Sequence, residues 1–427
     1  MSIFAPWKVL HIDLSDGIPA LPCEPDYQVL YVVFWWHSLP LGHQEISTTQ
    51  LPMPATQLAN LVLQTITPAV GDRLLEIGFK APLLEFPKHH MQNISPDFHA
   101  LMALEQPLAK LQERRTQPSG GSISVIVCTR ERPEQLARCL LTLQNLSQPP
   151  QEILVVDNAP TSVATRQLVS QMPGIRYVLE PRPGLSVARN TGIYHSTGDI
   201  IAFTDDDVEV HPQWLTHLQQ SFDHPKVMVV TGLVLPAELE TEAQLIFEKG
   251  FGYFNKGYCA KTFDSQFFEQ MKPLGVPAWE VGAGANMAIR RQAFDLVGTF
   301  DERLGAGAAG CSEDSEFWYR VLAEGWCCCY EPTAVVYHYH RRDLDSLRQQ
   351  IYQYMRGYVT SLLVQFARYK HWGNLRRLFA SLPIYYISRF FYGNLKGFKS
   401  FKRMLLAGIS GSFSGFKFYL QTSSYKQ

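Results

Sequence analysis

The sequence predicts an α/β fold in which a mostly parallel sheet is flanked by helices, with a β-rich domain before it and a helical tail after it. From Ile123 onward, short apolar runs alternate with helical segments, which is the pattern of parallel βαβ units. Polar residues follow directly after several of these runs. The composition changes on either side, and we therefore predict a β-rich domain over 1–115, a linker over 116–122, a central domain over 123–345 and a tail over 346–427.

The N-terminal region has strand character. The segment from Tyr27 to Trp36 is rich in β-branched and aromatic residues, and Pro40-Leu41-Gly42 after it is typical of a turn. Apolar residues then recur at helical spacing over 56–66, and a second helix is predicted over 96–114. Residues 117–122 have the Pro, Gly and Ser content of a flexible linker. The sequence does not indicate what this domain does.

The central domain is predicted from its apolar runs. A helix is expected to begin at Pro133, because proline is favoured in a first turn, and to bury Leu136, Leu140 and Leu143 on one face. The runs are short and apolar enough to be strands that are buried on both faces of a sheet. The other elements predicted here are strands over 123–127, 153–156, 175–179, 200–203 and 333–337, and a helix over 186–195.

Composition and charge limit the class of protein. The chain is 46% hydrophobic and 18% charged, as in an ordinary globular protein. The net charge of −1 conceals an asymmetry, because the tail from Ser346 has thirteen Lys and Arg and no Asp or Glu. The eight cysteines lack a disulfide spacing, and Cys327 to Cys329 are consecutive, so we expect packed thiols in a reduced, cytoplasmic protein. No secretory signal is expected at the N-terminus.

Three consecutive carboxylates, Asp205, Asp206 and Asp207, follow the strand that is predicted to end at Phe203. They would lie in the crevice at the carboxyl ends of the strands, where open α/β sheets bind ligands, and would repel one another there. A divalent cation resolves this repulsion, and oxygen ligands short of a full cage suit Mg²⁺ or Mn²⁺ bound to a diphosphate and water. The alternative is a solvated acidic turn before the helix expected near Pro212.

The central domain, which includes these acids, resembles the family 2 glycosyltransferases, which are inverting enzymes with the GT-A fold. Each matching motif is weak alone, but together and in order they are specific. The motifs are Val125-Ile126-Val127-Cys128-Thr129-Arg130, Val155-Val156-Asp157-Asn158, Gly184-Leu185-Ser186-Val187-Ala188-Arg189-Asn190-Thr191-Gly192, Phe203-Thr204-Asp205-Asp206-Asp207 and Glu313-Asp314-Ser315-Glu316-Phe317.

The resemblance implies a site for a nucleotide-sugar donor, with UDP, GDP or dTDP as the nucleotide. Thr129 and Arg132 would line the base and ribose, and Asp157 would accept hydrogen bonds from the base. Asp206 would lie near the ribose, and Arg189 would approach the diphosphate. Taken without the family, Asp157 is equally consistent with a turn, and Arg189 with a surface ion pair.

The resemblance also implies the catalytic groups. Asp205 and Asp207 would form a DxD pair that binds Mn²⁺ or Mg²⁺, and Asp314 would be the general base that deprotonates the acceptor hydroxyl. Glu313 is the other candidate base, and an acid at this position could instead cap a helix. In several relatives a histidine after a late strand reaches the metal, which makes His338 a third candidate ligand.

A dinucleotide fingerprint, GxGxxG, occurs at Gly305 to Gly310. This motif should follow the first strand of a βαβ unit, but here it comes late in the chain. The hypothesis of an NAD-linked oxidoreductase is therefore supported by these glycines alone. We expect them to form a mobile loop that gives an acceptor access to Asp314, together with the small residues at 282–285. The remaining alternative is a catalytically inactive scaffold that binds nucleotide sugars.

The basic, aromatic tail is expected to be helical. No apolar run in it reaches the roughly 18 to 20 residues of a membrane span, so we predict a helix at the bilayer interface, with basic residues facing anionic lipid. A helical cap packed on the central domain and an RNA-binding tail are the alternatives, and no nucleic-acid-binding module accompanies the charge. The resulting hypothesis is a cytoplasmic enzyme, peripheral to the inner face of the membrane, that modifies a glycan or lipid-linked acceptor.

Overall fold

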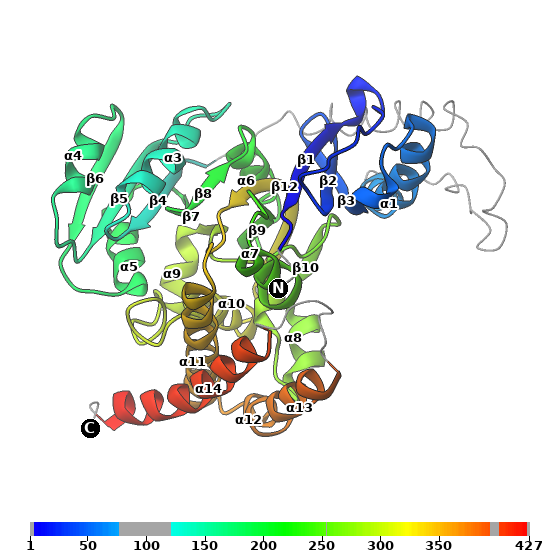
Figure 1. Ribbon diagram of the computed structural model, residues 1–427. Helices are drawn as coiled ribbons and strands as arrows, with labels where there is room; N and C mark the ends of the chain where they lie inside the picture. The colour runs from blue at the N-terminus through cyan, green and yellow to red at the C-terminus, as the bar shows by residue number, and fades with distance from the viewer. Residues whose placement is uncertain (1–3, 77–120, 253, 393–400, 425–427) are drawn as a thin grey trace. The chain divides into compact units, whose positions relative to one another are not determined.

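The computed structural model describes residues 4–76, 121–252, 254–392 and 401–424 (Figure 1). The described residues fall into two compact units. The first lies within 1–118, 236–241 and 257–260, and the second within 119–235, 242–256 and 261–427. The helix predicted over 96–114 and most of the predicted linker lie outside the described residues.

The first unit is a small sheet with one long helix. Strand β2 (Val29–Trp36) pairs with β1 (Trp7–Asp13) in parallel and with β3 (Leu39–Ser47) in antiparallel register. Helix α1 (Ala55–Glu76) packs on this sheet, and a Cβ at Gly42 in β3 would lie 2.7 Å from the Thr65 methyl group of α1. The strand predicted from aromatic and β-branched residues is therefore the central strand of this unit.

The second unit contains, in the described part of the chain, a nine-stranded sheet of order β10-β12-β9-β11-β7-β4-β5-β6, with β8 paired to β12. Strands β4 to β7 pair in parallel, as expected for βαβ units, whereas β8, β10 and β11 pair in antiparallel register. The strands are β4 (Ile123–Thr129), β5 (Glu152–Asn158), β6 (Ile175–Glu180), β7 (Ile200–Asp205), β8 (Val208–Val210), β9 (Val227–Pro236), β10 (Lys261–Phe263), β11 (Asn286–Arg290) and β12 (Cys327–His338).

Helices cover both faces of this sheet, so the predicted α/β class is confirmed. On one face, α3 and α6 share a buried apolar cluster with residues of β4, β5 and β12, and α3 begins at Pro133 and buries Leu136, Leu140 and Leu143 as expected. On the other face α5 packs so closely on β4 that a Cβ at Gly192 would lie 2.7 Å from Ile126. The helices are α3 (Pro133–Gln144), α4 (Ala164–Ser170), α5 (Leu185–His195), α6 (Trp214–Gln220), α7 (Glu242–Ile246), α8 (Ser265–Met271), α9 (Arg291–Val297) and α10 (Glu313–Ala323).

The basic tail forms helices that pack on one another. Helix α11 (Leu344–Tyr369) is capped by Asp343, whose carboxylate accepts a hydrogen bond from the Ser346 amide at 2.7 Å. After α12 (Trp372–Arg376) and α13 (Leu382–Tyr392), helix α14 (Phe401–Ser424) lies along α11. Leu347 of α11 and Phe401 of α14 also pack with Phe247 of the central domain, as a helical cap on that domain would. In the described residues, no helix combines the length and apolarity needed to cross a membrane.

Glycines on α14 allow the close contact with α11. A Cβ at Gly411 would lie 2.2 Å from the Tyr352 carbonyl oxygen, and one at Gly415 would lie 2.4 Å from the Arg356 carbonyl oxygen. Because these neighbours are backbone atoms, the helices cannot make room for a side chain without moving apart. The glycines therefore have a steric role that outweighs their low helix propensity.

We predict that Gly411→Ala destabilises the protein by about 1–3 kcal/mol, the usual cost of adding an atom to a packed contact. At an exposed helical position, the same substitution would stabilise by about 1 kcal/mol, so the sign of the effect is informative. Urea unfolding of the full chain measures it, and Ser410→Ala on the exposed side of α14 is the control. A Gly411→Ala variant at least as stable as the wild type would contradict the close packing.

Candidate functional site

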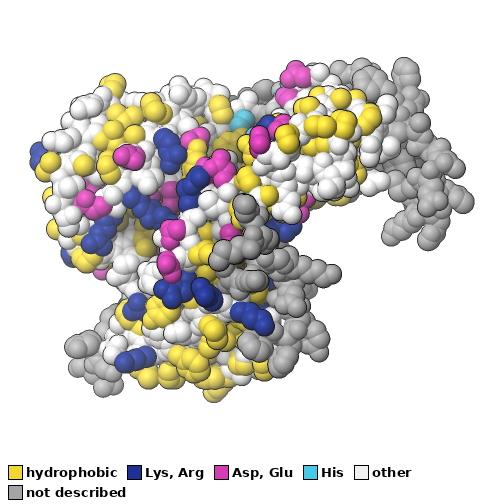
Figure 2. Space-filling view, in the orientation of Figure 1, with side chains coloured by type: hydrophobic (Ala, Val, Ile, Leu, Met, Phe, Trp, Pro, Cys, Tyr) yellow, Lys and Arg dark blue, Asp and Glu magenta, His cyan; other side chains and the backbone are white. Residues whose placement is uncertain are grey.

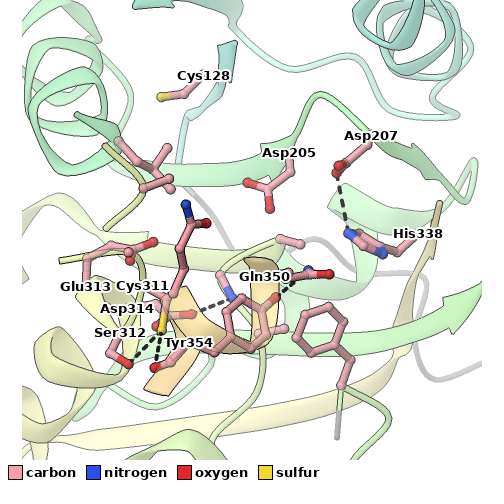
Figure 3. Close-up of a pocket in the computed structure, with 18 of the residues that line it drawn as sticks. Cys128, Asp205, Asp207, Cys311, Ser312, Glu313, Asp314, His338, Gln350 and Tyr354 are labelled. Atoms are coloured by element: carbon pink, nitrogen blue, oxygen red, sulfur yellow. Dashed lines mark hydrogen bonds and ion pairs between the residues drawn. The ribbon is translucent and has the colours of Figure 1, made fainter. Parts of the chain in front are cut away.

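A cavity of about 810 Å³ opens at the carboxyl ends of β4 and β7, between them and the start of α10 and α11 (Figure 3). This volume lies within the range of sites that hold small molecules. The structure brings nearly all the residues predicted from the sequence to this cavity. Those that line it are Thr129, Arg132, Arg189, Asp205, Asp206, Asp207, Glu313, Asp314 and His338.

The three acids predicted from the sequence lie at the end of β7, but their side chains have different partners. Asp206 is buried and accepts hydrogen bonds from Thr129 Oγ1 at 2.8 Å and from Arg132 Nη1 at 3.0 Å. Arg132 also donates to Asp207 Oδ2 at 3.2 Å. The Asp205 side chain is 35% exposed, and its carboxylate points into the cavity (Figure 3). The acids are therefore part of the cavity wall and do not form a solvated turn.

These acids also differ in pKa because their neighbours differ. Burial and the charge of Asp207 raise the pKa of Asp206 to about 6, against the opposing effect of Arg132. Burial raises the pKa of Asp205 as well, although Arg189 attracts its charge. For Asp207, burial is outweighed by the charge and hydrogen bond of His338 and by Arg132, and its pKa is lowered. A divalent cation beside these groups would favour the ionised form of each.

His338 lies next to Asp207 because of strand pairing. It is the last residue of β12 and pairs with Val208 of β8, directly after the acids. Its Nε2 lies 3.4 Å from Asp207 Oδ1, and its Nδ1 lies 2.8 Å from His340 Nδ1. His340 Nε2 in turn lies 3.0 Å from Glu248, which is on a π-helical turn, η3 (Phe247–Gly252). The His338 imidazole is thus oriented from behind by a second histidine and a carboxylate.

Asp207 and His338 have the chemistry and spacing of two neighbouring metal ligands. Two such ligands at about 2.1 Å from an octahedral ion lie about 3.0 Å apart, close to the 3.4 Å separation of these atoms. Carboxylate and imidazole suit Mn²⁺ or Mg²⁺ when further ligands are oxygens. Among the described residues, no group of three or more His, Cys, Asp and Glu side chains forms a metal site by itself. An ion here would therefore need oxygen ligands from a bound molecule or water.

Arg189 joins the end of β7 to the start of α10. Its side chain is 3% exposed, and Nη1 donates to Glu313 Oε1 at 2.8 Å. Its Nη2 lies 3.4 Å from Asp205 Oδ1 and 3.3 Å from the Gly284 carbonyl oxygen. A buried guanidinium with these partners is part of the cavity wall, so the surface ion pair considered for Arg189 is not what the structure has. Arg189 also lines the cavity.

Asp314 is held in the first turn of α10 by backbone donors. Its Oδ2 accepts a hydrogen bond from the Gly284 amide at 2.9 Å, and its Oδ1 accepts one from the Ser315 amide at 2.6 Å. Ser312, in a left-handed conformation with φ 69°, precedes the helix and turns the chain towards the cavity. A Cβ at Gly284 would lie 2.8 Å from Asp314 Oδ2, so a side chain at this position would displace the Asp314 carboxylate.

Asp157, unlike the other predicted residues, does not line the cavity. It is fully buried, and its Oδ2 accepts a hydrogen bond from the Tyr177 hydroxyl at 2.9 Å. Its neighbour Asn158 lines the cavity and accepts a hydrogen bond from the Gly184 amide at 2.9 Å, at the start of α5. Contact between Asp157 and a bound base remains a prediction.

Further residues that line the cavity were missed by the sequence reasoning. Arg341 follows the two histidines, and its Nη2 lies 3.9 Å from Asp207 Oδ2. Lys256 and Trp279 come from segments without a helical or strand period, so no local pattern marks them. The glycine-rich loop also reaches the cavity, and the Ala306 carbonyl oxygen ties it to α5 by accepting from the Leu185 amide at 2.8 Å. Movement of this loop stays a prediction.

Comparison with known proteins agrees with this geometry. Residues 124–297 match the family model described as glycosyl transferase family 2. Glycosyltransferase AglE of Haloferax volcanii is 30% identical over 191 residues, which cover 43% of this chain and 58% of AglE. The succinoglycan biosynthesis protein ExoM of Rhizobium meliloti is 29% identical over 228 residues, covering 50% of this chain and 66% of ExoM. The chain thus spans less than two thirds of the length of these relatives.

A solved structure is also similar. It is the mannosyltransferase PcManGT from Pyrobaculum calidifontis in complex with GDP-Man and Mn²⁺. The sequence identity is 16% and the TM-score 0.49, over 74% of this chain and 97% of that chain.

We predict that Glu313 makes stability depend on pH. Burial raises its pKa to about 7, although Arg189 opposes the shift. The folded protein therefore keeps a proton on Glu313 that the unfolded chain releases near pH 4.5, and this contribution to stability is lost as the pH rises towards 7. Glu313→Gln should remove this pH dependence. As the pH rises through this window, the free energy of unfolding of the variant should therefore increase relative to that of the wild type, by up to about 1.4 kcal/mol per pH unit.

Urea unfolding between about pH 4.5 and 8 measures this difference. Glu302→Gln is the control, because it removes an exposed carboxylate of the same domain. Parallel pH profiles for the wild type and Glu313→Gln would contradict the prediction.

Proposed function

We propose that this chain, which belongs to the family 2 glycosyltransferases over residues 124–297, transfers a sugar from a nucleotide-diphosphate sugar to an acceptor hydroxyl with inversion. The observation that carries the proposal is the placement of two sets of acids around one cavity. Asp205 and Asp207 lie across it from Glu313 and Asp314 (Figure 3). Direct displacement requires such an arrangement, with a charge-stabilising group at the leaving diphosphate and a base at the attacking hydroxyl.

The donor is proposed to bind at the end formed by β4, β5 and β7. Thr129, Arg132 and Asp206 form one hydrogen-bonded group there, which suits contacts to a base and ribose. Asp157 pairs with Thr129 between β4 and β5, and one of its carboxylate oxygens is buried without a hydrogen-bond partner in the described structure. Arg189 is proposed to approach the diphosphate, since its guanidinium lines the cavity beside Asp205.

A divalent cation, Mn²⁺ or Mg²⁺, is proposed to bind at Asp207 and His338, with Asp205 facing it from the end of β7. When bound, it would stabilise the negative charge that the nucleoside diphosphate gains on departure. His340 and Glu248 are proposed to position His338, because a hydrogen-bonded carboxylate behind a ligating imidazole fixes its orientation. The small number of protein ligands leaves coordination positions for the diphosphate.

Asp314 is proposed to be the general base. The Gly284 and Ser315 amides hold its carboxylate in one orientation, and its side chain lines the cavity. Glu313 is less suited to this role, because Arg189 binds one of its oxygens and its pKa is raised to about 7 by burial. The pair Arg189 and Glu313 instead supports the cavity wall beside the base.

Two substitutions separate donor binding from chemistry. We predict that Asp314→Asn lowers kcat by about 10²–10⁴-fold, the usual contribution of a general base, and leaves the dissociation constant of the nucleoside diphosphate within about twofold. Asp207→Asn should instead abolish the Mn²⁺-dependent part of nucleotide binding. Calorimetric titration with UDP, GDP and dTDP, with and without Mn²⁺, measures binding, and release of nucleotide from the sugar donor measures turnover.

Wild-type protein that binds a nucleotide with Mn²⁺ but never turns a donor over would support the inactive scaffold. Sugar transfer and cation dependence that are both intact in Asp207→Asn would overturn the proposed metal site.

The biological context is proposed to be synthesis of a surface polysaccharide or glycolipid, as the name of the relative ExoM suggests. The outer face of α14 supports a membrane-bound setting. Leu406, Phe413 and Leu420 are more than half exposed on it, next to exposed Lys402 and Lys417. In Figure 2, apolar and basic side chains gather over the region of α12 to α14. We propose that this face contacts anionic lipid on the inner side of the cytoplasmic membrane.

We predict that Leu406→Gln with Phe413→Gln lowers binding to vesicles of anionic lipid about tenfold or more, because each apolar side chain is worth about 1.5–3 kcal/mol when buried. Flotation of the full chain with phosphatidylglycerol vesicles measures this, and neutral phosphatidylcholine vesicles show the part due to charge. Leu141→Gln with Val163→Gln is the matched control, since Leu141 is exposed on α3 and Val163 is exposed immediately before α4. Equal flotation of the two double variants would contradict the proposed membrane contact.

A further inference from the structure

The proposed chemistry leaves a buried lysine of the cavity without a role. Lys256 has a side chain that is 5% exposed, yet it lines the cavity. Its Nζ lies 3.9 Å from Glu280 Oε2, which is too long for a hydrogen bond, and the Glu280 side chain is 46% exposed. Burying an ammonium group whose counter-ion is neither hydrogen-bonded to it nor buried with it is costly. A lysine placed in this way is therefore suited to binding an anion that enters the cavity.

The surroundings of Lys256 place it at the acceptor end. Its electrostatic neighbours include Glu280 and Asp314, the proposed base, and burial lowers its pKa. Trp279, adjacent to Glu280, also lines the cavity and is held by Tyr358 at a centroid distance of 5.4 Å and by the Arg377 guanidinium at 4.7 Å.

Helix α11 supplies the rest of this wall with polar and aromatic side chains. Gln349, Gln350, Gln353, Tyr354 and Tyr358 line the cavity from successive turns of the helix. Amide and aromatic groups of this kind can hydrogen-bond to hydroxyls and pack against sugar rings. The wall therefore suits a sugar, and the lysine adds one positive charge to it.

We propose that Lys256 binds an anionic group of the acceptor, so that the acceptor carries a phosphate or a carboxylate near the hydroxyl that receives the sugar. This inference rests on the proposed function, because it assigns the acceptor half of the same cavity. An ammonium is a compact charge that accepts either anion. A lipid-linked glycosyl phosphate and a uronic acid of a glycan both supply this chemistry, and the experiment distinguishes them.

The experiment measures binding at the acceptor end after the donor end is filled. The full chain is saturated with Mn²⁺ and the nucleoside diphosphate that it binds, and is then titrated with an alkyl glucoside, the matching alkyl glucuronide or the matching alkyl glucosyl phosphate. We expect one of the anionic probes to bind at least about tenfold more tightly than the neutral probe, as for a charge-assisted contact. The preferred probe identifies the source of the anion.

Lys256→Gln should abolish this preference without changing the dissociation constant of the nucleotide, and Lys256→Arg should retain most of it. Glu280→Gln is the discriminating control. If Lys256 and Glu280 only stabilise the wall as a pair, both variants weaken binding equally, whereas an anion-binding lysine is unaffected or strengthened by loss of Glu280. Lys226→Gln, at an exposed position outside the cavity, controls for the loss of one charge.

Failure of any nucleoside diphosphate to bind the wild type would contradict the proposed function itself. Nucleotide binding with no preference for either anionic probe, or an undiminished preference in Lys256→Gln, would overturn the role of Lys256 alone. A change in nucleotide affinity in Lys256→Gln would overturn it too, because it would place the lysine at the donor.

Discussion

The region around the cavity depends on one electrostatic constraint, which is that acids from two distant segments are kept close together where little water reaches them. Asp205 to Asp207 end β7, and Glu313 and Asp314 begin α10. Their repulsion would separate these segments unless a cation offset it. Arg189 does so from α5, by binding Glu313 and Asp205 with a buried guanidinium. Because an unpaired buried charge costs several kcal/mol, α5, β7 and α10 are interdependent.

The backbone before β11 also helps to position the proposed base. Gly284 brings its amide to Asp314 and its carbonyl oxygen to Arg189, and a Cβ at this position would crowd both side chains. Gly282 is similarly constrained, since a Cβ there would lie 2.5 Å from the Thr231 side chain on β9. These small residues let the segment before β11 pass close to both the base and the sheet. The position of the base thus follows from packing in the antiparallel half of the sheet.

The sequence predicted the parallel half of the fold well because each strand there is one apolar run that ends in a polar residue. The same logic located the acids after β7, since the end of a strand fixes the edge at which its next residues lie. In the antiparallel half, the strand at 333–337 within β12 was predicted, but the strand pairing was not, because the pairing of β11 with β7 and β9 joins segments far apart in the chain. Lys256, Trp279 and Arg341 reach the cavity through such long-range packing and not through a local pattern. The chemical roles of the predicted residues follow from the family resemblance and stay predictions.

Helix α11 connects the cavity to the outer surface of the tail. One side of it lines the cavity through residues such as Gln353 and Tyr354, whereas Tyr352 and Arg356 contact the glycines of α14. The helix that borders the proposed acceptor therefore also supports the apolar, basic face proposed to contact lipid. An acceptor anchored in the same membrane would be held in two dimensions near this wall, which raises its effective concentration without any added contact. Weak individual contacts to the acceptor would then suffice, so a single buried lysine can have a large effect on which acceptor is used.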